Sequence, residues 1–122
     1  MGGTGTMKIL LLLNDAPYGV ERTYNALRTA GALAKREGVE LKLFLVGDAA
    51  AAAKSGQKVP AGYYNTEVML AGPLRHGAAV GVCGTCMDAR GIRDADLVPG
   101  SHRGTLEEMA DWILWADKVI VF

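Results

Sequence analysis

The feature that most constrains the fold is a short apolar run near the start of the chain, KILLLL, from Lys8 to Leu13. No polar residue interrupts it after Lys8, and it ends at Asn14 and Asp15. A continuous apolar run is typical of a strand buried on both faces, whereas a strand with one wet face alternates. We therefore predict a central strand of a parallel sheet, a kind of sheet that needs helices on both faces.

The rest of the chain alternates strand-like and helix-like segments. Further strands are predicted at 41–46 and 78–82, with a brief one around 97–98 and a buried terminal one at 118–122. Helices are predicted at 19–37, 65–75 and 105–116, with a short helix at 48–54. The capping-box pattern of Thr105 and Glu108 marks the start of the last long helix. This alternation predicts a single three-layer α/β/α domain around a mostly parallel sheet.

Length and charge narrow the class of protein further. The 122 residues fit one domain, which we place at 7–122, with 1–6 as a flexible lead-in. Thirteen basic residues balance thirteen acidic ones, so no basic excess favours nucleic-acid binding. The apolar runs are far shorter than the roughly 20 residues of a membrane helix, and the N-terminus lacks the features of a secretory signal. We expect a cytoplasmic protein with no nucleic-acid or membrane partner.

Two cysteines three positions apart carry the strongest local signal for chemistry. Cys83 falls where a predicted central strand ends, and Gly84 and Thr85 should open a short helix. A sulfur at a helix N-terminus meets unpaired backbone N–H groups and the positive end of the helix dipole, and both favour the nucleophilic thiolate. Cys83 is therefore a candidate nucleophile, although a buried cysteine can equally be a small hydrophobe that closes the strand.

Cys86 has three interpretations. It is a resolving thiol that forms a disulfide with Cys83, a metal ligand, or a residue that packs inward. A structural zinc site needs four ligands, and only His76 and His102 remain, without zinc-finger spacing. The glycine-containing loops match no nucleotide-binding pattern either. We therefore expect neither a metal nor a cofactor.

Two charged residues of the predicted short helix lie close to the cysteines in sequence. Arg90 could serve as a partner for an anion or for a thiolate. Asp88 lies early in the helix, where a negative charge is favourable, and the two residues could also be a solvated pair. The functional and the structural interpretation both stay open for these residues.

The end of the first strand offers a second group of polar residues. Asn14, Asp15 and Tyr18 should face the same edge of the sheet as Cys83, although turn formation alone also explains them. His102 is predicted in a glycine-containing loop at this edge, where it could act as a base or simply be exposed. We include the first three residues in the predicted binding site.

The predicted last helix indicates self-association. Its apolar stripe is Leu106, Met109, Ala110, Ile113 and Ala116. This stripe leaves Trp115 on the opposite side of the helix and Trp112 on its flank. Tryptophan outside the stripe, on a surface with no net charge, favours a protein interface, while packing under a loop of the same chain is the alternative.

Five stretches in this order match a known family. They are KILLLLNDAPYG at 8–19, LFLVGDA at 43–49, GQK at 56–58, CGTCMDARGI at 83–92 and WADKVIVF at 115–122. The chain resembles the DsrE/DsrF-like family, and within it the YchN subfamily, over essentially all of 7–122. The resemblance implies a five-stranded parallel sheet and a homo-oligomer, commonly a trimer or hexamer.

The resemblance also implies a function. In better-understood relatives, a cysteine that matches Cys83 holds sulfane sulfur as a persulfide and passes it on, which implies sulfur donor or acceptor proteins as partners. Relay subunits typically have a small residue at the position of Cys86, whereas the YchN branch keeps the second cysteine. Cys86 is then expected to attack the Cys83 persulfide and release sulfide. Any catalysis would be sulfurtransferase-like, and the alternative is a non-catalytic oligomeric binding or adaptor module with structural cysteines.

Overall fold

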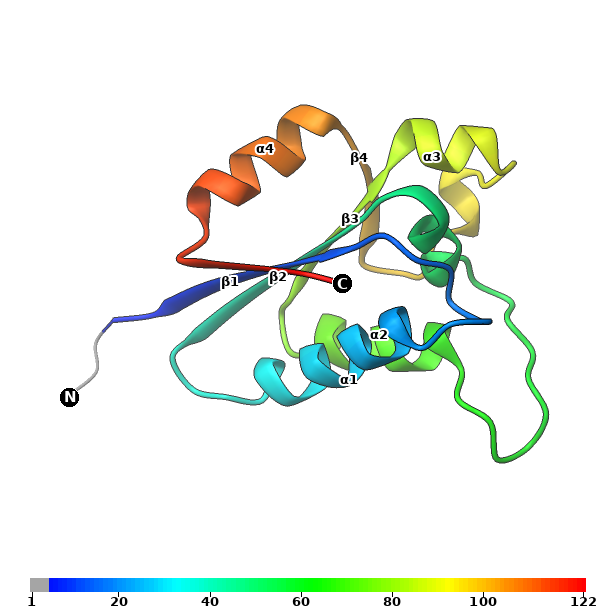
Figure 1. The fold of residues 1–122 in the computed structure, drawn as a ribbon, viewed down its shortest axis with the longest axis horizontal. Helices are drawn as coiled ribbons and strands as arrows, with labels where there is room; N and C mark the ends of the chain where they lie inside the picture. The colour runs from blue at the N-terminus through cyan, green and yellow to red at the C-terminus, as the bar shows by residue number, and fades with distance from the viewer. Residues whose placement is uncertain (1–4) are drawn as a thin grey trace.

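The computed structural model describes residues 5–122 as a five-stranded parallel sheet with strand order β4-β3-β2-β1-β5 (Figure 1). The strands are β1 (Met7–Leu13), β2 (Val39–Leu45), β3 (Ala79–Cys83), β4 (Ser101–Gly104) and β5 (Lys118–Val121). The helices are α1 (Arg22–Ala34), α2 (Thr66–Arg75), α3 (Gly84–Ala89) and α4 (Leu106–Trp115), with 3₁₀ helices η1 (Gly47–Ala53) and η2 (Asp94–Asp96). The predicted three-layer α/β domain is confirmed.

Several predicted bounds differ from the observed ones by a few residues. The helix predicted at 19–37 is limited to α1, since the backbone before Arg22 is irregular. The short helix at 48–54 is the 3₁₀ helix η1. Residues 1–4 of the predicted lead-in lie outside the described residues, and Met7 begins β1. Among the described residues, no helix is long and apolar enough to cross a membrane.

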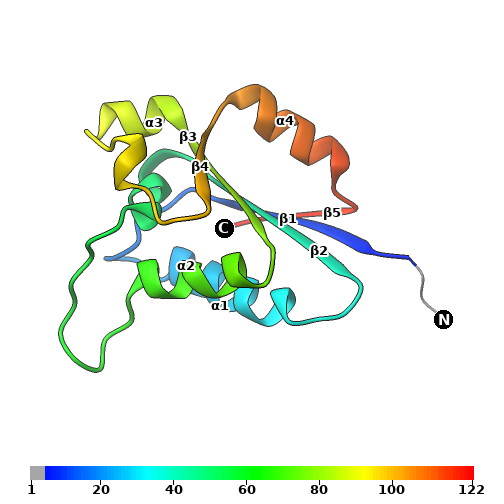
Figure 2. The ribbon, with the colours of Figure 1, turned by 180° about the vertical axis from the view of Figure 1, so that it is seen from behind.

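The two faces of the sheet are covered unequally. Helices α1 and α2 lie on one face and α4 lies on the other (Figures 1 and 2). The face under α1 and α2 contributes alternate residues of the central strands, such as Leu11, Leu43 and Val80, to a large core that is closed to solvent. The face under α4 has a much smaller core of Leu10, Phe44 and Trp112. Among the described residues, the helical side chains that pack into this small core with Cys83 come from α4.

The orientation of α4 corrects the predicted apolar stripe. Trp112 is buried and its ring meets Phe44 edge-on, with centroids 5.6 Å apart, so this tryptophan faces the sheet. Trp115 is half-buried, with the Lys42 ammonium 4.3 Å from its ring centroid. Leu106 of the predicted stripe is instead 68% exposed. The large area that Trp112 buries against Phe44 outweighs the simple periodicity of the smaller residues.

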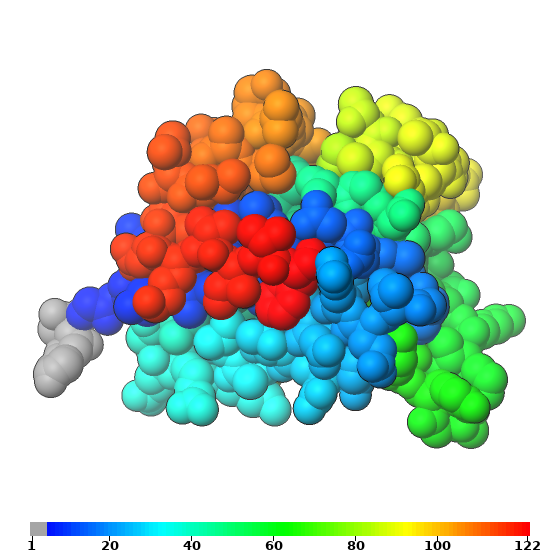
Figure 3. Space-filling model, viewed as in Figure 1, coloured from blue at the N-terminus to red at the C-terminus, as the bar shows by residue number. Residues whose placement is uncertain are grey.

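Both edge strands differ from their predictions. The brief strand predicted at 97–98 is absent from the described residues, where Leu97 makes only an isolated bridge with Lys54; the edge strand is β4. The strand predicted as buried at 118–122 is β5, an edge strand whose four residues are all exposed. In Figure 3 it forms an open face of the molecule between α4 and α1. An edge strand has one neighbour in the sheet, and no helix among residues 5–122 covers β5.

Candidate functional site

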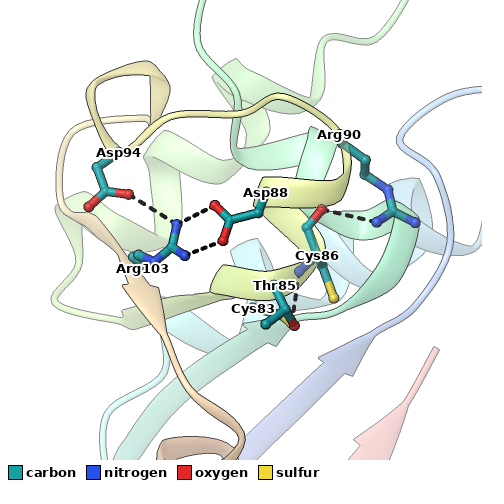
Figure 4. Close-up of polar contacts among 7 residues, drawn as sticks. All are labelled: Cys83, Thr85, Cys86, Asp88, Arg90, Asp94 and Arg103. Carbon is teal, nitrogen blue, oxygen red and sulfur yellow. Dashed lines mark hydrogen bonds and ion pairs between the residues drawn. The ribbon is translucent and has the colours of Figure 1, made fainter.

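Cys83 is the last residue of β3 and the N-cap residue of α3 (Figure 4). Its Sγ accepts a hydrogen bond from the backbone N–H of Cys86 at 3.3 Å. The hydroxyl of Thr85 lies 3.3 Å from the same sulfur. Both cysteines are free and half-buried. The strand-to-helix junction therefore directs two hydrogen-bonding groups at one thiol, at the carboxyl end of a central strand.

These contacts determine the protonation of Cys83. Burial by itself raises the pKa of the thiol, but the side chains and backbone N–H groups of Cys86 and Thr85 hydrogen-bond the sulfur and lower it further than burial raises it. The net effect is a pKa of Cys83 below its ordinary value. Cys83 is thus the thiol of this pair that ionises first.

Cys86 lies in a different environment. Its Sγ accepts a hydrogen bond from the backbone N–H of Gly47 at 3.1 Å. Gly47 has a φ of +56°, and an added Cβ would lie 3.5 Å from the carbonyl oxygen of Asn14, so glycine suits this turn. Burial and the contact with Cys83 raise the pKa of the Cys86 thiol despite the Gly47 hydrogen bond. The chain therefore pairs a cysteine whose pKa is lowered with one whose pKa is raised.

Arg90 lies on the Cys86 side of the site. Its Nη1 donates to the carbonyl oxygen of Cys86 at 3.0 Å, as Figure 4 shows. Its Nε and Nη2 donate to one carboxylate oxygen of Asp48 at 3.1 and 2.7 Å. Arg90 thus ties the end of α3 to η1, and its charge is directed at Asp48 rather than at the sulfur of Cys83.

Asp88 has a partner that sequence reasoning missed, Arg103 of β4. The guanidinium donates to the two carboxylate oxygens of Asp88 at 2.9 and 2.7 Å and lies 3.5 Å from Asp94 (Figure 4). The hydrogen bonds from Arg103 hold the pKa of Asp88 below its usual range. The sequence gives little indication that Arg103 pairs with Asp88. Its one clue is that Arg103 lies two residues before Thr105, close to this edge of the sheet.

The absence of a side chain at Gly84 leaves room for the side chain of Arg103. An added Cβ at Gly84 would lie 2.8 Å from Nε and 3.0 Å from Cζ of that side chain, closer than real Cβ atoms come. The guanidinium therefore lies against the first turn of α3, next to Cys83. Arg103 therefore links both ends of the segment 83–88 to β4, a strand that was not predicted.

A cavity of about 500 Å³ opens beside Cys83, between the start of α3 and the start of α4. Its apolar lining comes from Phe44, Val46, Leu106 and Met109. Its polar lining comes from Thr85, Arg103, Thr105 and Glu107. The cavity leaves space for a bound molecule beside the Cys83 thiol.

The polar residues after β1 make contacts of their own. The side chain and backbone N–H of Asn14 both donate to the carbonyl oxygen of Phe122 at 3.1 Å. The backbone oxygen of Asp15 accepts from Thr23 at 2.6 Å. In the part of the chain that the structure describes, none of the hydrogen bonds of Asn14, Asp15 and Tyr18 reaches either cysteine. Asn14 is connected to the site through Gly47, which lies next to the Asn14 carbonyl oxygen and donates a hydrogen bond to Cys86.

Tyr18 and His102 also have partners away from the cysteines. The Tyr18 hydroxyl donates to Gln57 at 2.5 Å and helps to anchor the loop before α2. The expected loop position of His102 is wrong, because it lies in β4, where both carboxylate oxygens of Glu108 are 2.8 Å from its Nε2. Among residues 5–122, no three potential metal-ligating side chains gather in one place.

Comparison with known proteins places this geometry in a family. The model of the DsrE/DsrF-like family matches residues 7–122. The chain belongs to the DsrE/DsrF-like family. It is 45% identical to the YchN protein of Escherichia coli K12 over 116 residues, which is 94% of this chain and 98% of that protein. It is 36% identical to an uncharacterised protein of Methanocaldococcus jannaschii over 95% of this chain and the whole of that protein.

Solved structures agree with this assignment. The crystal structure of E. coli YchN superposes with a TM-score of 0.90 at 44% identity, and the match covers 96% of this chain and all of that chain. A protein of unknown function from Methanobacterium thermoautotrophicum gives a TM-score of 0.71 at 11% identity, over 96% of this chain and 99% of that chain. The second likeness concerns the fold alone. The predicted family and the YchN-like fold are therefore confirmed.

Proposed function

We propose that this DsrE/DsrF-like protein carries sulfane sulfur as a persulfide on Cys83. The observation that supports this most is the lowered pKa of Cys83, in a thiol that borders a cavity at the carboxyl edge of the sheet. The Cys83 thiolate attacks the sulfane sulfur of a donor persulfide RS–SH. A bond forms between Sγ and that sulfur, the donor S–S bond breaks, and its electron pair leaves with the thiolate RS⁻.

Cys86 supplies the resolving thiol of the proposed cycle. Once deprotonated, it attacks Sγ of the Cys83 persulfide, forms a disulfide with Cys83 and expels hydrosulfide, HS⁻. A cellular dithiol then reduces the disulfide and is itself oxidised. The raised pKa of Cys86 keeps it protonated while Cys83 is loaded, so that transfer to an acceptor protein competes with release of sulfide.

Intact-protein mass spectrometry tests this proposal. The reduced wild type, Cys83→Ser and Cys86→Ser are each incubated with inorganic polysulfide. We expect one added sulfur atom, removable by a reductant, on Cys86→Ser and none on Cys83→Ser. The wild type should accumulate less than Cys86→Ser, because Cys86 discharges the persulfide. Failure of all three proteins to gain sulfur, while Cys83 reacts with an alkylating reagent, would overturn the carrier function.

The second candidate function is a homo-oligomeric binding module. One observation favours self-association of this chain. Exposed apolar side chains run along β5 and the outer side of α4; they are Ile113, Leu114, Val119, Ile120 and Val121. The free edge of β5 can also pair with another strand. We propose that this surface, here called the α4–β5 surface, joins copies of the chain into a trimer or hexamer. Self-association is compatible with sulfur transfer, and a reduced cytoplasm would keep both thiols free.

A further inference from the structure

The cavity beside Cys83 has an apolar side, and a molecule in the cavity would approach the Cys83 thiol along that side. Cys83 packs with the small core of Leu10, Phe44 and Trp112, so its side chain lies on the α4 side of the sheet. Phe44 and Met109 line the cavity on that side, and Leu106, 68% exposed, forms its outer wall. A molecule that presents sulfur to Cys83 from this cavity therefore places its remaining atoms against apolar side chains.

The charges around the cavity disfavour an anionic occupant. Arg103 is the only Lys or Arg among the described residues that line it, and its guanidinium is already held by Asp88. Asp94 lies 3.5 Å from the same guanidinium, and Glu107 adds a carboxylate to the cavity wall. Two carboxylates thus contact this guanidinium, and a third lines the cavity. An anion such as thiosulfate would meet like charge and would find no unpaired cation.

We propose that the partner of Cys83 in sulfur exchange is a small organic sulfur compound with an uncharged, apolar body. This inference rests on the proposed sulfur-carrier function and specifies its substrate class. The compound RS–SH places R against Phe44, Leu106 and Met109 and its sulfane sulfur at Cys83. The thiolate takes that sulfur, the S–S bond of the donor breaks, and RS⁻ leaves and is protonated by water. The reverse reaction returns sulfur to an apolar thiol.

Loading rates with matched donors test the substrate class. Wild type and Cys86→Ser are mixed with benzyl persulfide, glutathione persulfide or thiosulfate, and sulfur on Cys83 is followed by intact mass. We expect benzyl persulfide to load Cys83 at least about tenfold faster than glutathione persulfide, since small apolar groups in such pockets change rates by about 10–200-fold. Equal or faster loading by either charged donor overturns the substrate class while leaving the carrier function intact. Failure of every donor, including inorganic polysulfide, overturns the carrier function itself.

A pair of variants separates the cavity from general effects on the protein. Leu106→Ser makes the cavity wall polar, and Val68→Ser makes the same kind of change on α2, away from the cavity, at a residue of matching exposure, 67% against 68%. Leu106→Ser should reduce the preference for benzyl over glutathione persulfide by several-fold. Val68→Ser should leave the preference as it is. An unchanged preference in Leu106→Ser would contradict the proposal.

Discussion

The guanidinium of Arg103 lies across Gly84, with Nε 2.8 Å from the place where a Cβ would stand. Arg103 belongs to β4 and Gly84 is the first residue of α3, so this contact joins the edge strand to the helix that begins at Cys83. The hydrogen bonds from Arg103 to Asp88 complete the link at the other end of the helix. The position of Cys83 therefore depends on a strand that follows it in sequence.

Gly84→Ala should destabilise the protein, because the added methyl group forces Arg103 or the first turn of α3 to move. Overpacking of this kind costs about 1–3 kcal/mol. Urea denaturation measures the loss in the free energy of unfolding. The double variant Gly84→Ala, Arg103→Ala removes the contacting side chain, so it should lose less stability than the sum of the two single variants. Strict additivity would show that the two residues do not restrain each other.

The ion pair of Asp88 and Arg103 predicts a local pH dependence. The pKa of Asp88 is lowered by its hydrogen bonds from Arg103, so the pair contributes stability above the ordinary pKa of an aspartate. That contribution is lost as the pH falls through the lowered pKa of the folded state. Carboxyl NMR titration should show the pKa of Asp88 rising toward its ordinary value in Arg103→Gln. The same pKa in the variant and the wild type would rule out the pair as its cause.

Much of the fold followed from residues that are buried on both faces. The run at 8–13 predicts β1 correctly because a central parallel strand has no wet face, and the short run before Cys83 predicts β3 for the same reason. From these strands the junction at Cys83 could be placed at the correct edge of the sheet. The family resemblance then agreed with that placement.

The parts that could not be predicted depend on tertiary contacts. β4 is polar, and its residues His102 and Arg103 find their partners on α4 and α3, which no local pattern reveals. The orientation of α4 depends on the packing of Trp112 on Phe44, a contact 68 positions apart in sequence. The cavity is lined by residues as far apart in sequence as Phe44 and Met109, which no local pattern brings together.

Labelling of Cys83 should respond to the hydroxyl of Thr85. This hydroxyl is among the groups that lower the pKa of Cys83, so Thr85→Val should raise that pKa. Alkylation by iodoacetamide follows the thiolate, and its rate rises with pH through the pKa. The midpoint of the rate profile, measured in a Cys86→Ser background, should therefore move to higher pH in Thr85→Val. Thr85→Ser keeps the hydroxyl and should retain the original midpoint; a shift of equal size in Thr85→Ser would contradict this assignment.

The α4–β5 surface should control self-association. Val121 is 63% exposed on the edge strand, and Val121→Lys places a charge there, which is a common way in which proteins prevent edge pairing. In sedimentation velocity the wild type should exceed the 12.9 kDa of one chain, and Val121→Lys should shift toward the monomer. Val68→Lys, the same change on α2, should sediment like the wild type. A monomeric wild type would remove the basis for this surface.

The charge of the cavity wall should decide how well an anionic donor reaches Cys83. Glu107 lines the cavity, and Glu107→Lys replaces a like charge with an attractive one for thiosulfate. Loading of Cys83 by thiosulfate should become several-fold faster at low salt, and the gain should shrink as salt screens the added charge. Loading by benzyl persulfide should change little, because the uncharged benzyl group has no charge–charge interaction with residue 107. Glu37→Lys makes the same change in net charge at an exposed residue between α1 and β2, and should leave the thiosulfate rate unaltered. An equal gain in Glu37→Lys would mean that net charge, and not the cavity wall, governs access to the thiol.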